Sequence, residues 1–474
     1  MCRHMATTPQ LQFLGANRQV TGSRYLLRAG GLKIMIDCGM FQERAFRSRN
    51  WDLSPIDPSE IDVLLVTHAH LDHCGLIPKL VKEGYAGPIY MTAPSMDLAR
   101  IVLEDAARIQ EEDAAYKKKR HQRERRRGAH PEVPLYTAAD ATACFRLFQP
   151  VRYDKAYALN DRVSVVFRDA GHILGSASIE VVITGEGEPT QVLFSGDLGQ
   201  FDAPLMRDPA VMTGGEFVVM ESTYGDRVQT PARAVDDQLA AVVNATIERG
   251  GKVIIPTFAI DRAQDLLFHF SELVRDGRIA DVPIYLDSPM AVDVTDVFKR
   301  YMFLLDEETQ ELLDSGEHPF HFRNLRLVRT TQESKQINSS RKPSIILAGS
   351  GMCTGGRVKH HLSQNISKPE ATVLFVGYQS QGTLGREILE GTSPVRIHGK
   401  FHEVNAQIER IEGMSAHADR EQLLRWFSSL EVQPWQVYLT HGEEAASLAL
   451  AEAVQAQFEV SVSVPEYEDS VSLA

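Results

Sequence analysis

The segment Thr67-His68-Ala69-His70-Leu71-Asp72-His73 carries four side chains that can bind a metal, at positions 68, 70, 72 and 73. The preceding run, Ile61–Val66, is apolar and rich in β-branched residues, which predicts a buried strand. Leu76–Val81 predicts the start of a helix, because Pro78 is tolerated in a first helical turn. We therefore expect these ligands where a strand gives way to a helix, a place where rigid elements hold functional groups. Imidazole and carboxylate bind zinc, and about three or four of them complete a site, so the segment can begin two metal sites.

Composition is typical of a globular enzyme. A chain of 474 residues has room for about two or three domains, and 43% hydrophobic with 24% charged residues is ordinary. The net charge of −13 gives no general attraction to nucleic acid or to an anionic membrane. We find no apolar run of membrane-spanning length and no signal-peptide core at the amino terminus. Five scattered cysteines without a Cys-x-x-Cys pair indicate a reduced, cytoplasmic protein.

Several apolar runs further along the chain end in a polar residue of chemical interest. A histidine or carboxylate of this kind follows or closes a short run at five places, namely His172, Asp197, Glu221, His417 and His441. A lone histidine is more often a satisfied core or loop residue than a ligand. Taken in order with the first segment, however, the five positions form a specific pattern.

That order resembles the metallo-β-lactamase superfamily and, within it, the β-CASP nucleases, over essentially the whole chain. Asp37 is similar to the aspartate that supports the metal loop in this family. Glu221, His417 and His441 match the three motifs that distinguish the β-CASP group. The superfamily signature alone leaves a thioesterase, a lactamase and a phosphodiesterase open, and the resemblance to these three motifs favours a nuclease. A histidine at position 441, where DNA-directed relatives tend to carry valine, favours RNA.

The resemblance implies the ligands of two Zn²⁺ ions. One would take His68, His70 and His172, the other Asp72, His73 and His441, and Asp197 would bridge them. Manganese accepts the same nitrogen and oxygen donors, so Mn²⁺ stays open. Two cations activate water and stabilise charge on a phosphate, so no serine or cysteine nucleophile is required.

The resemblance also implies catalytic roles for Asp72, Glu221 and His417. His417 is the candidate general acid and Glu221 its partner, because a nearby carboxylate favours imidazolium. The structural alternative for Glu221 is a capping residue on the turn at Ser222 and Thr223.

The expected fold is α/β: a metallo-β-lactamase αββα sandwich with an inserted Rossmann-like α/β (β-CASP) domain. We expect residues 1–220 and 405–474 to form the sandwich and residues 221–404 the insert. Four continuous apolar runs alternate with helical patterns in the insert and predict buried, mostly parallel strands at Lys252–Pro256, Val282–Leu286, Ser344–Ala348 and Thr372–Val376. Asp261 predicts a helix cap with Gln264 as in a capping box, although the family often has glycine at position 261.

Two glycine-rich turns in the insert, Gly349–Arg357 and Gly377–Arg386, expose backbone N–H groups beside a helix start, where phosphate binds readily. They match stretches that line the RNA groove in the family, although ordinary tight turns explain them equally well. The candidate substrate-binding residues are Ser350, Gly351, Gly382, Thr383 and Arg262.

The basic run Lys117–Arg127 predicts either the solvated end of a long helix or an arm that guides RNA by attracting phosphates.

Together these features predict a cytoplasmic, zinc-dependent ribonuclease that acts on single-stranded RNA and has no membrane partner. The resemblance implies products with a 5′-phosphate and a free 3′-hydroxyl, and internal and end-directed cleavage both stay open. The resemblance also leaves a homodimer open. The alternatives are a DNA nuclease, a thioesterase or lactonase on the same fold, and a non-catalytic RNA-binding scaffold.

Overall fold

The structure is a computed structural model that describes residues 8–51, 55–125, 128–185, 188–229 and 235–474. The chain forms two compact units, and each is described by itself. The first, called the sandwich unit, contains the chain up to residue 201 together with residues 208–228 and 417–474. The second, called the insert unit, contains residues 202–207 and 229–416. The boundary expected after residue 220 falls inside the sandwich unit, and the one expected after residue 404 falls inside the insert unit.

The first sheet of the sandwich unit joins the two ends of the chain. Its order is β22-β1-β2-β3-β4-β5-β6, with β22 (Ser470–Ser472), β1 (Gln10–Gly15), β2 (Arg24–Ala29), β3 (Leu32–Ile36), β4 (Val63–Leu65), β5 (Ile89–Thr92) and β6 (Phe148–Val151). Strand β22 pairs antiparallel with β1 and sets Ser472 opposite Gln10. The strand predicted before the metal-binding segment is confirmed as β4, and it lies inside this sheet.

The second sheet has the order β21-β20-β11-β10-β9-β8-β7. Its strands are β7 (Ala156–Ala158), β8 (Val163–Asp169), β9 (Ala177–Ile183), β10 (Thr190–Phe194), β11 (Phe217–Glu221), β20 (Gln436–Thr440) and β21 (Ser461–Ser463). Strands β10, β11 and β20 are parallel neighbours. Their carboxyl ends therefore meet at one edge of the sheet, and the residues that follow them lie side by side there.

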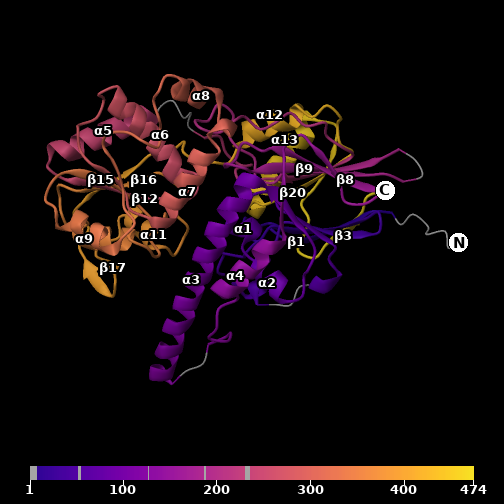
Figure 1. Cartoon of the computed structure of the whole chain (residues 1–474), viewed down its shortest axis with the longest axis horizontal. Helices are drawn as coiled ribbons and strands as arrows, with labels where there is room; N and C mark the ends of the chain where they lie inside the picture. The colour runs from indigo at the N-terminus through magenta and orange to yellow at the C-terminus, as the bar shows by residue number, and fades with distance from the viewer. Residues whose placement is uncertain (1–7, 52–54, 126–127, 186–187, 230–234) are drawn as a thin grey trace. The chain divides into compact units, whose positions relative to one another are not determined.

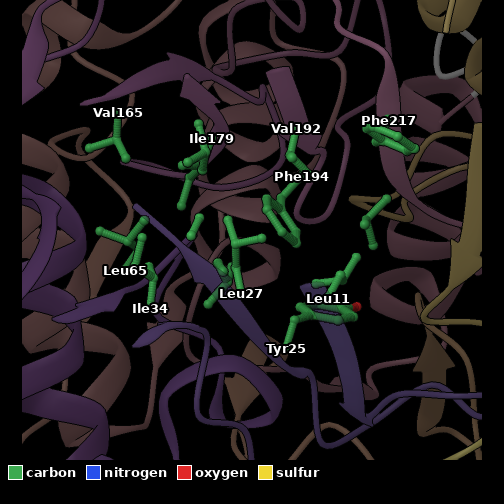
Figure 2. Packing of buried hydrophobic residues seen from close by; sticks show 14 of the residues in the cluster. Leu11, Tyr25, Leu27, Ile34, Leu65, Val165, Ile179, Val192, Phe194 and Phe217 are labelled. Atoms are coloured by element: carbon green, nitrogen blue, oxygen red, sulfur yellow. The ribbon is translucent and has the colours of Figure 1, made fainter. Parts of the chain in front are cut away.

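The core of the sandwich unit lies between these two sheets. Leu27 and Leu65 from the first sheet pack with Val165, Ile179 and Phe194 from the second, and all are buried (Figure 2). Side chains alternate between the two faces of a strand, so the other residues of the second sheet face outward. There they meet helices, which completes the αββα sandwich and confirms the fold predicted from the sequence.

Helices cover the outer faces of both sheets. On the first sheet α3 (Ala93–Glu124) contacts β5 and β6, and α4 (Ala138–Cys144) packs on α2 (Ile77–Lys82) and α3. On the second sheet Val218 and Leu439 pack against Trp426 of α12 (Arg420–Ser428) and Leu450 of α13 (Glu444–Gln457). Short helical turns in the chain are α1 (Leu71–Cys74), η1 (Arg47–Asn50), η2 (Pro58–Glu60), η3 (Phe145–Leu147) and η5 (Met302–Leu304). No described helix combines the length and apolar character needed to cross a bilayer.

The insert unit is built on a parallel sheet with the order β14-β13-β15-β12-β16-β19. Its strands are β12 (Lys252–Pro256), β13 (Ile284–Leu286), β14 (Leu325–Leu327), β15 (Ser344–Ala348), β16 (Thr372–Phe375) and β19 (Gln407–Arg410), beside a hairpin of β17 (Val395–Ile397) and β18 (Lys400–His402). Its helices are α5 (Val235–Glu248), α6 (Arg262–Arg275), α7 (Pro289–Arg300), α8 (Glu307–Asp314), α9 (Thr331–Ser339), α10 (Val358–Asn365) and α11 (Leu384–Leu389) (Figure 1). The four predicted parallel strands are confirmed as β12, β13, β15 and β16.

The capping box predicted at the start of α6 is wrong. Asp261 does occupy the N-cap position, but its side chain makes no capping hydrogen bond, because its φ of 65° and ψ of −70° are not the extended geometry of a capping residue. The amide of Gln264 donates instead to Thr295 Oγ1 at 2.9 Å. A positive φ is easiest for glycine, which explains why a glycine would suit position 261.

Candidate metal centre

The predicted metal-binding segment spans the loop after β4 and the short helix α1. His68 and His70 lie on the loop, and Asp72 and His73 lie within α1. The buried carboxylate of Asp37, just after β3, holds the segment in place: Oδ1 accepts from Thr67 N at 2.8 Å, and Oδ2 lies 2.7 Å from His73 Nδ1. A carboxylate on the far nitrogen of an imidazole orients the ring and leaves Nε2 for a metal. The supporting role expected for Asp37 therefore has a geometric basis.

The remaining candidate ligands come from one edge of the second sheet. Asp197 follows β10 and His441 follows β20, while His172 lies on the loop that joins β8 to β9. Ala177 N, at the start of β9, donates to Thr67 O at 2.9 Å, which ties this edge to the metal-binding segment. The sandwich thus brings together residues from five separate parts of the chain.

The ligand atoms form two adjacent groups. In the first, His70 Nδ1 lies 3.1 Å from His68 Nε2 and 3.2 Å from His172 Nε2, and Asp197 Oδ2 lies 3.5 Å from His68 Nε2. In this group the four ligand atoms all lie within 4.8 Å of one another. Every side chain points its nitrogen or oxygen inward, which is the arrangement needed to surround a cation.

In the second group His73 Nε2 lies 3.0 Å from His441 Nε2, which in turn lies 3.6 Å from Asp72 Oδ2. Asp197 Oδ1 is 3.2 Å from His73 Nε2. This oxygen is buried, and although His73 Nε2 and His441 Nδ1 lie 3.2 and 3.4 Å away, it receives no hydrogen bond of good geometry from the described residues. A buried carboxylate oxygen without a hydrogen bond is costly unless a cation satisfies it. Asp197 therefore faces both groups with one oxygen each, and the residues fit divalent cations on chemical grounds.

Electrostatics at the first group favour ligation. Burial lowers the pKa of His70 to about 4 and holds the pKa of His68 well below its usual range. Both imidazoles are therefore neutral near pH 7, and a neutral imidazole is the form that binds a metal. For His73, burial alone would lower the pKa, but Asp197 and Asp37 raise it well above the usual value. A cation bound there takes the place of that proton.

Glu221 and His417 form a buried pair at the same sheet edge. Glu221, the last residue of β11, is 1% exposed, and Oε2 lies 3.1 Å from His417 Nδ1. Its Oε1 accepts from Leu198 N at 2.5 Å. Burial alone would lower the pKa of His417, but Glu221 raises it to about 10, so the imidazole holds a proton at neutral pH. The carboxylate of Glu221 is thus directed at His417 and Leu198, away from a cap on the turn at Ser222 and Thr223.

Three supporting residues escaped the sequence analysis. Thr67 Oγ1 lies 3.1 Å from His68 Nδ1, and Thr223 Oγ1 lies 3.1 Å from His441 Nδ1. Ser23 Oγ donates to Asp37 Oδ2 at 3.3 Å. Thr67 and Thr223 could have been inferred, because each directly adjoins a motif that was already recognised. Ser23 lies outside every motif and has no signal of its own.

The candidate substrate-binding residues all lie in the insert unit. Gln379 Nε2 donates to Gly351 O at 2.9 Å, and Gly385 N donates to Met352 O at 3.2 Å, so the two glycine-rich turns are joined. Ser350 is half-buried, Gly351 is buried and Gly382 is exposed. Thr383 caps α11 and accepts from Arg386 N at 3.3 Å.

Arg262 has a different environment from the glycine-rich turns. It is 8% exposed, and its Nη1 pairs with Asp265 Oδ2 at 2.7 Å. The guanidinium is therefore already engaged by a carboxylate of its own helix.

An αββα sandwich with inward-facing imidazoles and carboxylates at the shared edge of its sheets defines a metallo-hydrolase. Comparison with known families agrees: the metallo-β-lactamase superfamily matches residues 18–256, the Beta-Casp domain residues 263–388, and a Zn-dependent metallo-hydrolase RNA specificity domain residues 402–465. The chain belongs to the β-CASP group of the metallo-β-lactamase superfamily, and it is a metal-dependent hydrolase.

Individual relatives agree with this assignment. A ribonuclease of Thermus thermophilus is 39% identical over 92% of this chain and 94% of its own length. The transcription termination factor FttA of Methanocaldococcus jannaschii is 33% identical over 98% of this chain and 71% of its own length. A crystal structure of a protein of unknown function from Enterococcus faecalis covers 98% of this chain and 100% of that chain with a TM-score of 0.56 and 11% identity. This last likeness supports the fold alone.

Proposed function

We propose that this protein hydrolyses phosphodiester bonds of single-stranded RNA with the help of two divalent cations, Zn²⁺ or Mn²⁺. The observation that carries the proposal is the pair of adjacent ligand groups that share Asp197, with a protonated histidine beside them. The similarity to a ribonuclease and the RNA specificity domain at residues 402–465 support RNA as the substrate.

His68, His70 and His172 would hold one cation, and Asp72, His73 and His441 the other, with Asp197 shared between them. Cations bound there would supply an activated water and stabilise the charge that develops on the phosphate. Asp37 fixes the ring of His73 and, with Thr67, the path of the metal-binding segment. Asp72 would act in catalysis as a ligand of the second cation.

His417 would donate a proton to the leaving 3′ oxygen, which leaves a 5′-phosphate on the other product. Its Nδ1 is held by Glu221, so Nε2 is the atom that carries the proton to the substrate. The negative charge of Glu221 keeps the ring protonated until it gives up that proton. Glu221 would position the imidazole of His417 and keep it protonated, and it does not need to touch RNA.

The two joined glycine-rich turns of the insert unit are our candidate for RNA contact, through Ser350, Gly351, Gly382 and Thr383. Arg262 would have to exchange Asp265 for a phosphate to take part.

We place the protein in the cytoplasm, since the described cysteines, Cys38, Cys74, Cys144 and Cys353, are all free thiols. The family resemblance leaves a homodimer open, and light scattering of the purified protein, which gives the mass of the particle, tests it.

End-labelled substrates test the function. Metal-loaded protein is incubated with single-stranded RNA labelled at either end, beside DNA of the same sequence. His417→Ala is the test variant, and His321→Ala, an exposed histidine of the insert unit, is its matched control. We expect cleavage of RNA by the wild type and by His321→Ala, a loss of roughly 10²–10⁴-fold in His417→Ala, and none with chelator.

The product ladder then gives the polarity of cleavage. Equal cleavage of DNA would overturn the choice of RNA. Intact RNA in the presence of two bound metals per chain would overturn the nuclease and favour a small-molecule hydrolase on the same fold.

A further inference from the structure

The far end of α3 carries an excess of positive charge in a protein whose net charge is −13. We call residues Tyr116–Arg125 the α3 tip. Within it Lys117, Lys118, Lys119, Arg123 and Arg125 are all exposed. No carboxylate of the described residues forms an ion pair with any of these five. The tip therefore presents uncompensated charge to solvent.

The start and middle of the same helix differ from the tip. Arg100 lies 3.5 Å from Asp97, and Arg108 forms ion pairs with Asp105 and Glu112. The arginines there are thus neutralised by carboxylates on neighbouring turns, as is usual for a solvated helix surface. Within the tip only Arg120 has such a partner, Glu124 at 3.8 Å, so intrahelical ion pairing leaves the charge of the five exposed cations unbalanced.

The tip is held in place by the segment that returns from it. His121 is 8% exposed, and its Nδ1 lies 2.6 Å from Glu132 Oε1. Further back along the helix, Leu135 N donates to Gln110 Oε1 at 3.1 Å. These contacts occupy one side of α3, which extends past α2 and α4 (Figure 1). On the opposite side of the tip, Tyr116, Lys119 and Arg123 are exposed within the sandwich unit.

An exposed aromatic ring lies on that side of α3, where the run of cations begins. Tyr116 is 65% exposed. Lys119 and Arg123 follow it at i+3 and i+7, so at about 3.6 residues per turn the three side chains share one helix face. His121 and the buried Ala114 lie on the other face. A flat ring with cations on the following turns of the same helix face is a combination that binds single-stranded nucleic acid, because bases stack on the ring while phosphates meet the charges.

We propose that the α3 tip is a second binding site for single-stranded RNA, remote from the metal centre, in which Tyr116 stacks on a base and Lys119 and Arg123 contact phosphates. This inference rests on RNA being the substrate. The tip supplies the local attraction that the acidic protein as a whole lacks, and it acts on affinity and leaves the chemical step unchanged.

The length of α3 also sets the minimum length of an RNA strand that can reach both the metal centre and the tip. Ser95 in its first turn donates to Gly175 O at 2.7 Å, on the loop that carries His172. Tyr116 lies 21 positions further along, which is about 32 Å at ~1.5 Å per residue. At the spacing of roughly 3.4 Å per stacked nucleotide, a strand needs about nine nucleotides to cover that length. Very short RNA therefore cannot occupy the metal centre and the tip together.

The test compares two double variants with the same change in net charge. Lys119→Glu/Arg123→Glu alters the tip, and Lys155→Glu/Arg162→Glu alters exposed residues beside the edge strand β7. Cleavage of RNA of about 30 and about four nucleotides is followed over a range of salt concentrations. For the longer RNA we expect the tip variant to raise KM about tenfold at an unchanged kcat. We also expect the slope of log KM against log salt to fall by about 1.4, at ~0.7 for each lost phosphate contact. The short RNA should be cleaved as by the wild type.

Tyr116→Ala separates stacking from charge. It should raise KM for the longer RNA and leave the salt slope unchanged, whereas Tyr116→Phe should behave as the wild type. An unchanged KM in Lys119→Glu/Arg123→Glu, the same effect in the control pair, or an equal loss on the short RNA would each overturn the proposal. If the wild type cleaves no RNA, the proposed function fails, and fluorescence anisotropy with the longer RNA still decides the tip: weaker binding in the tip variant alone supports it, and equal binding overturns it.

Discussion

His417 Nδ1 lies 3.1 Å from Glu221 Oε2, although 196 positions separate the two residues in the chain. Glu221 closes β11, and His417 opens the last segment of the sandwich unit. Folding thus sets a buried carboxylate behind the imidazole of His417. The pair also adjoins the ligand groups, since His417 Nδ1 is 4.0 Å from Asp197 Oδ2.

Replacing Glu221 with glutamine tests this relationship. Glu221→Gln removes the charge that keeps His417 protonated and retains the shape of the side chain. We expect kcat on RNA to fall about 10²-fold with KM within about twofold, because proton donation weakens while binding does not. Glu452→Gln, on an exposed turn of α13, is the control. An equal fall in the control, or wild-type kcat in Glu221→Gln, contradicts the assigned role.

Asp37 is expected to set metal affinity without binding metal itself. Asp37→Asn weakens the hold on His73 Nδ1 and on Thr67, and the orientation of the ligand ring loosens. Such a change lowers metal affinity by about 10–100-fold. Zinc titration with a competing chelator measures it, and Asp57→Asn, at an exposed turn, should leave the affinity as it is in the wild type. Tight zinc binding by Asp37→Asn would show that the segment holds its shape without this carboxylate.

Gly39 permits the close approach of β3 to the metal-binding segment. A Cβ atom at position 39 would lie 1.6 Å from Asp72 O, a backbone atom that cannot move without displacing α1. We expect Gly39→Ala to lose metal and to lower the free energy of unfolding by about 1–3 kcal/mol. A Cβ at Gly185 meets no atom within 4 Å, so Gly185→Ala is the matched control. Urea unfolding and bound zinc are measured together, and full zinc content in Gly39→Ala would contradict the packing argument.

A buried network of hydrogen bonds and ion pairs around Asp287 stabilises the insert unit, and its contribution to the free energy of unfolding decreases in acid. Asp287 is fully buried, with Oδ2 2.6 Å from His361 Nε2 and Oδ1 2.6 Å from Arg357 Nη1. Burial alone would raise the pKa of Asp287, but hydrogen bonds from His361, Ser334 and Arg357 lower it below its usual value. Asp287→Asn leaves Arg357 without its charged partner, and we expect a loss of about 3–5 kcal/mol at pH 7.

The sign of the pH dependence follows from the lowered pKa. The unfolded chain binds this proton more tightly than the folded one, so the stabilisation is complete above the unfolded pKa of about 4 and is lost as the pH falls through the lower folded value. The gap in the free energy of unfolding between wild type and Asp287→Asn should therefore narrow below about pH 4. Asp276→Asn, half-exposed at the end of α6, should show neither effect. A gap that stays constant from pH 7 into the acid range would mean that Asp287 does not titrate with folding.

The local sequence predicted secondary structure correctly where a strand or helix depends only on the residues within it. The apolar runs predicted β4, β12 and β15, because continuous, β-branched segments have few alternatives to a buried strand. The N-cap of α6 shows the limit, because the positive φ of Asp261 is imposed by the surrounding chain and cannot be read from the Asp261–Gln264 spacing. Helix α1 was also missed, since its four residues are too short for a periodic pattern to appear.

The sequence by itself determined the kinds of ligands, their order and the family to which they point, because these depend on residue identity and motif spacing alone. Only the tertiary structure decided that Asp197 faces both ligand groups, that Asp37 orients His73, and that Glu221 lies behind His417. Each of these relationships joins residues on different strands, and their distances are set by sheet order and by the packing of two sheets across a shared core. The open face of the α3 tip belongs to the same class, since only the fold shows which side of the helix the returning segment occupies.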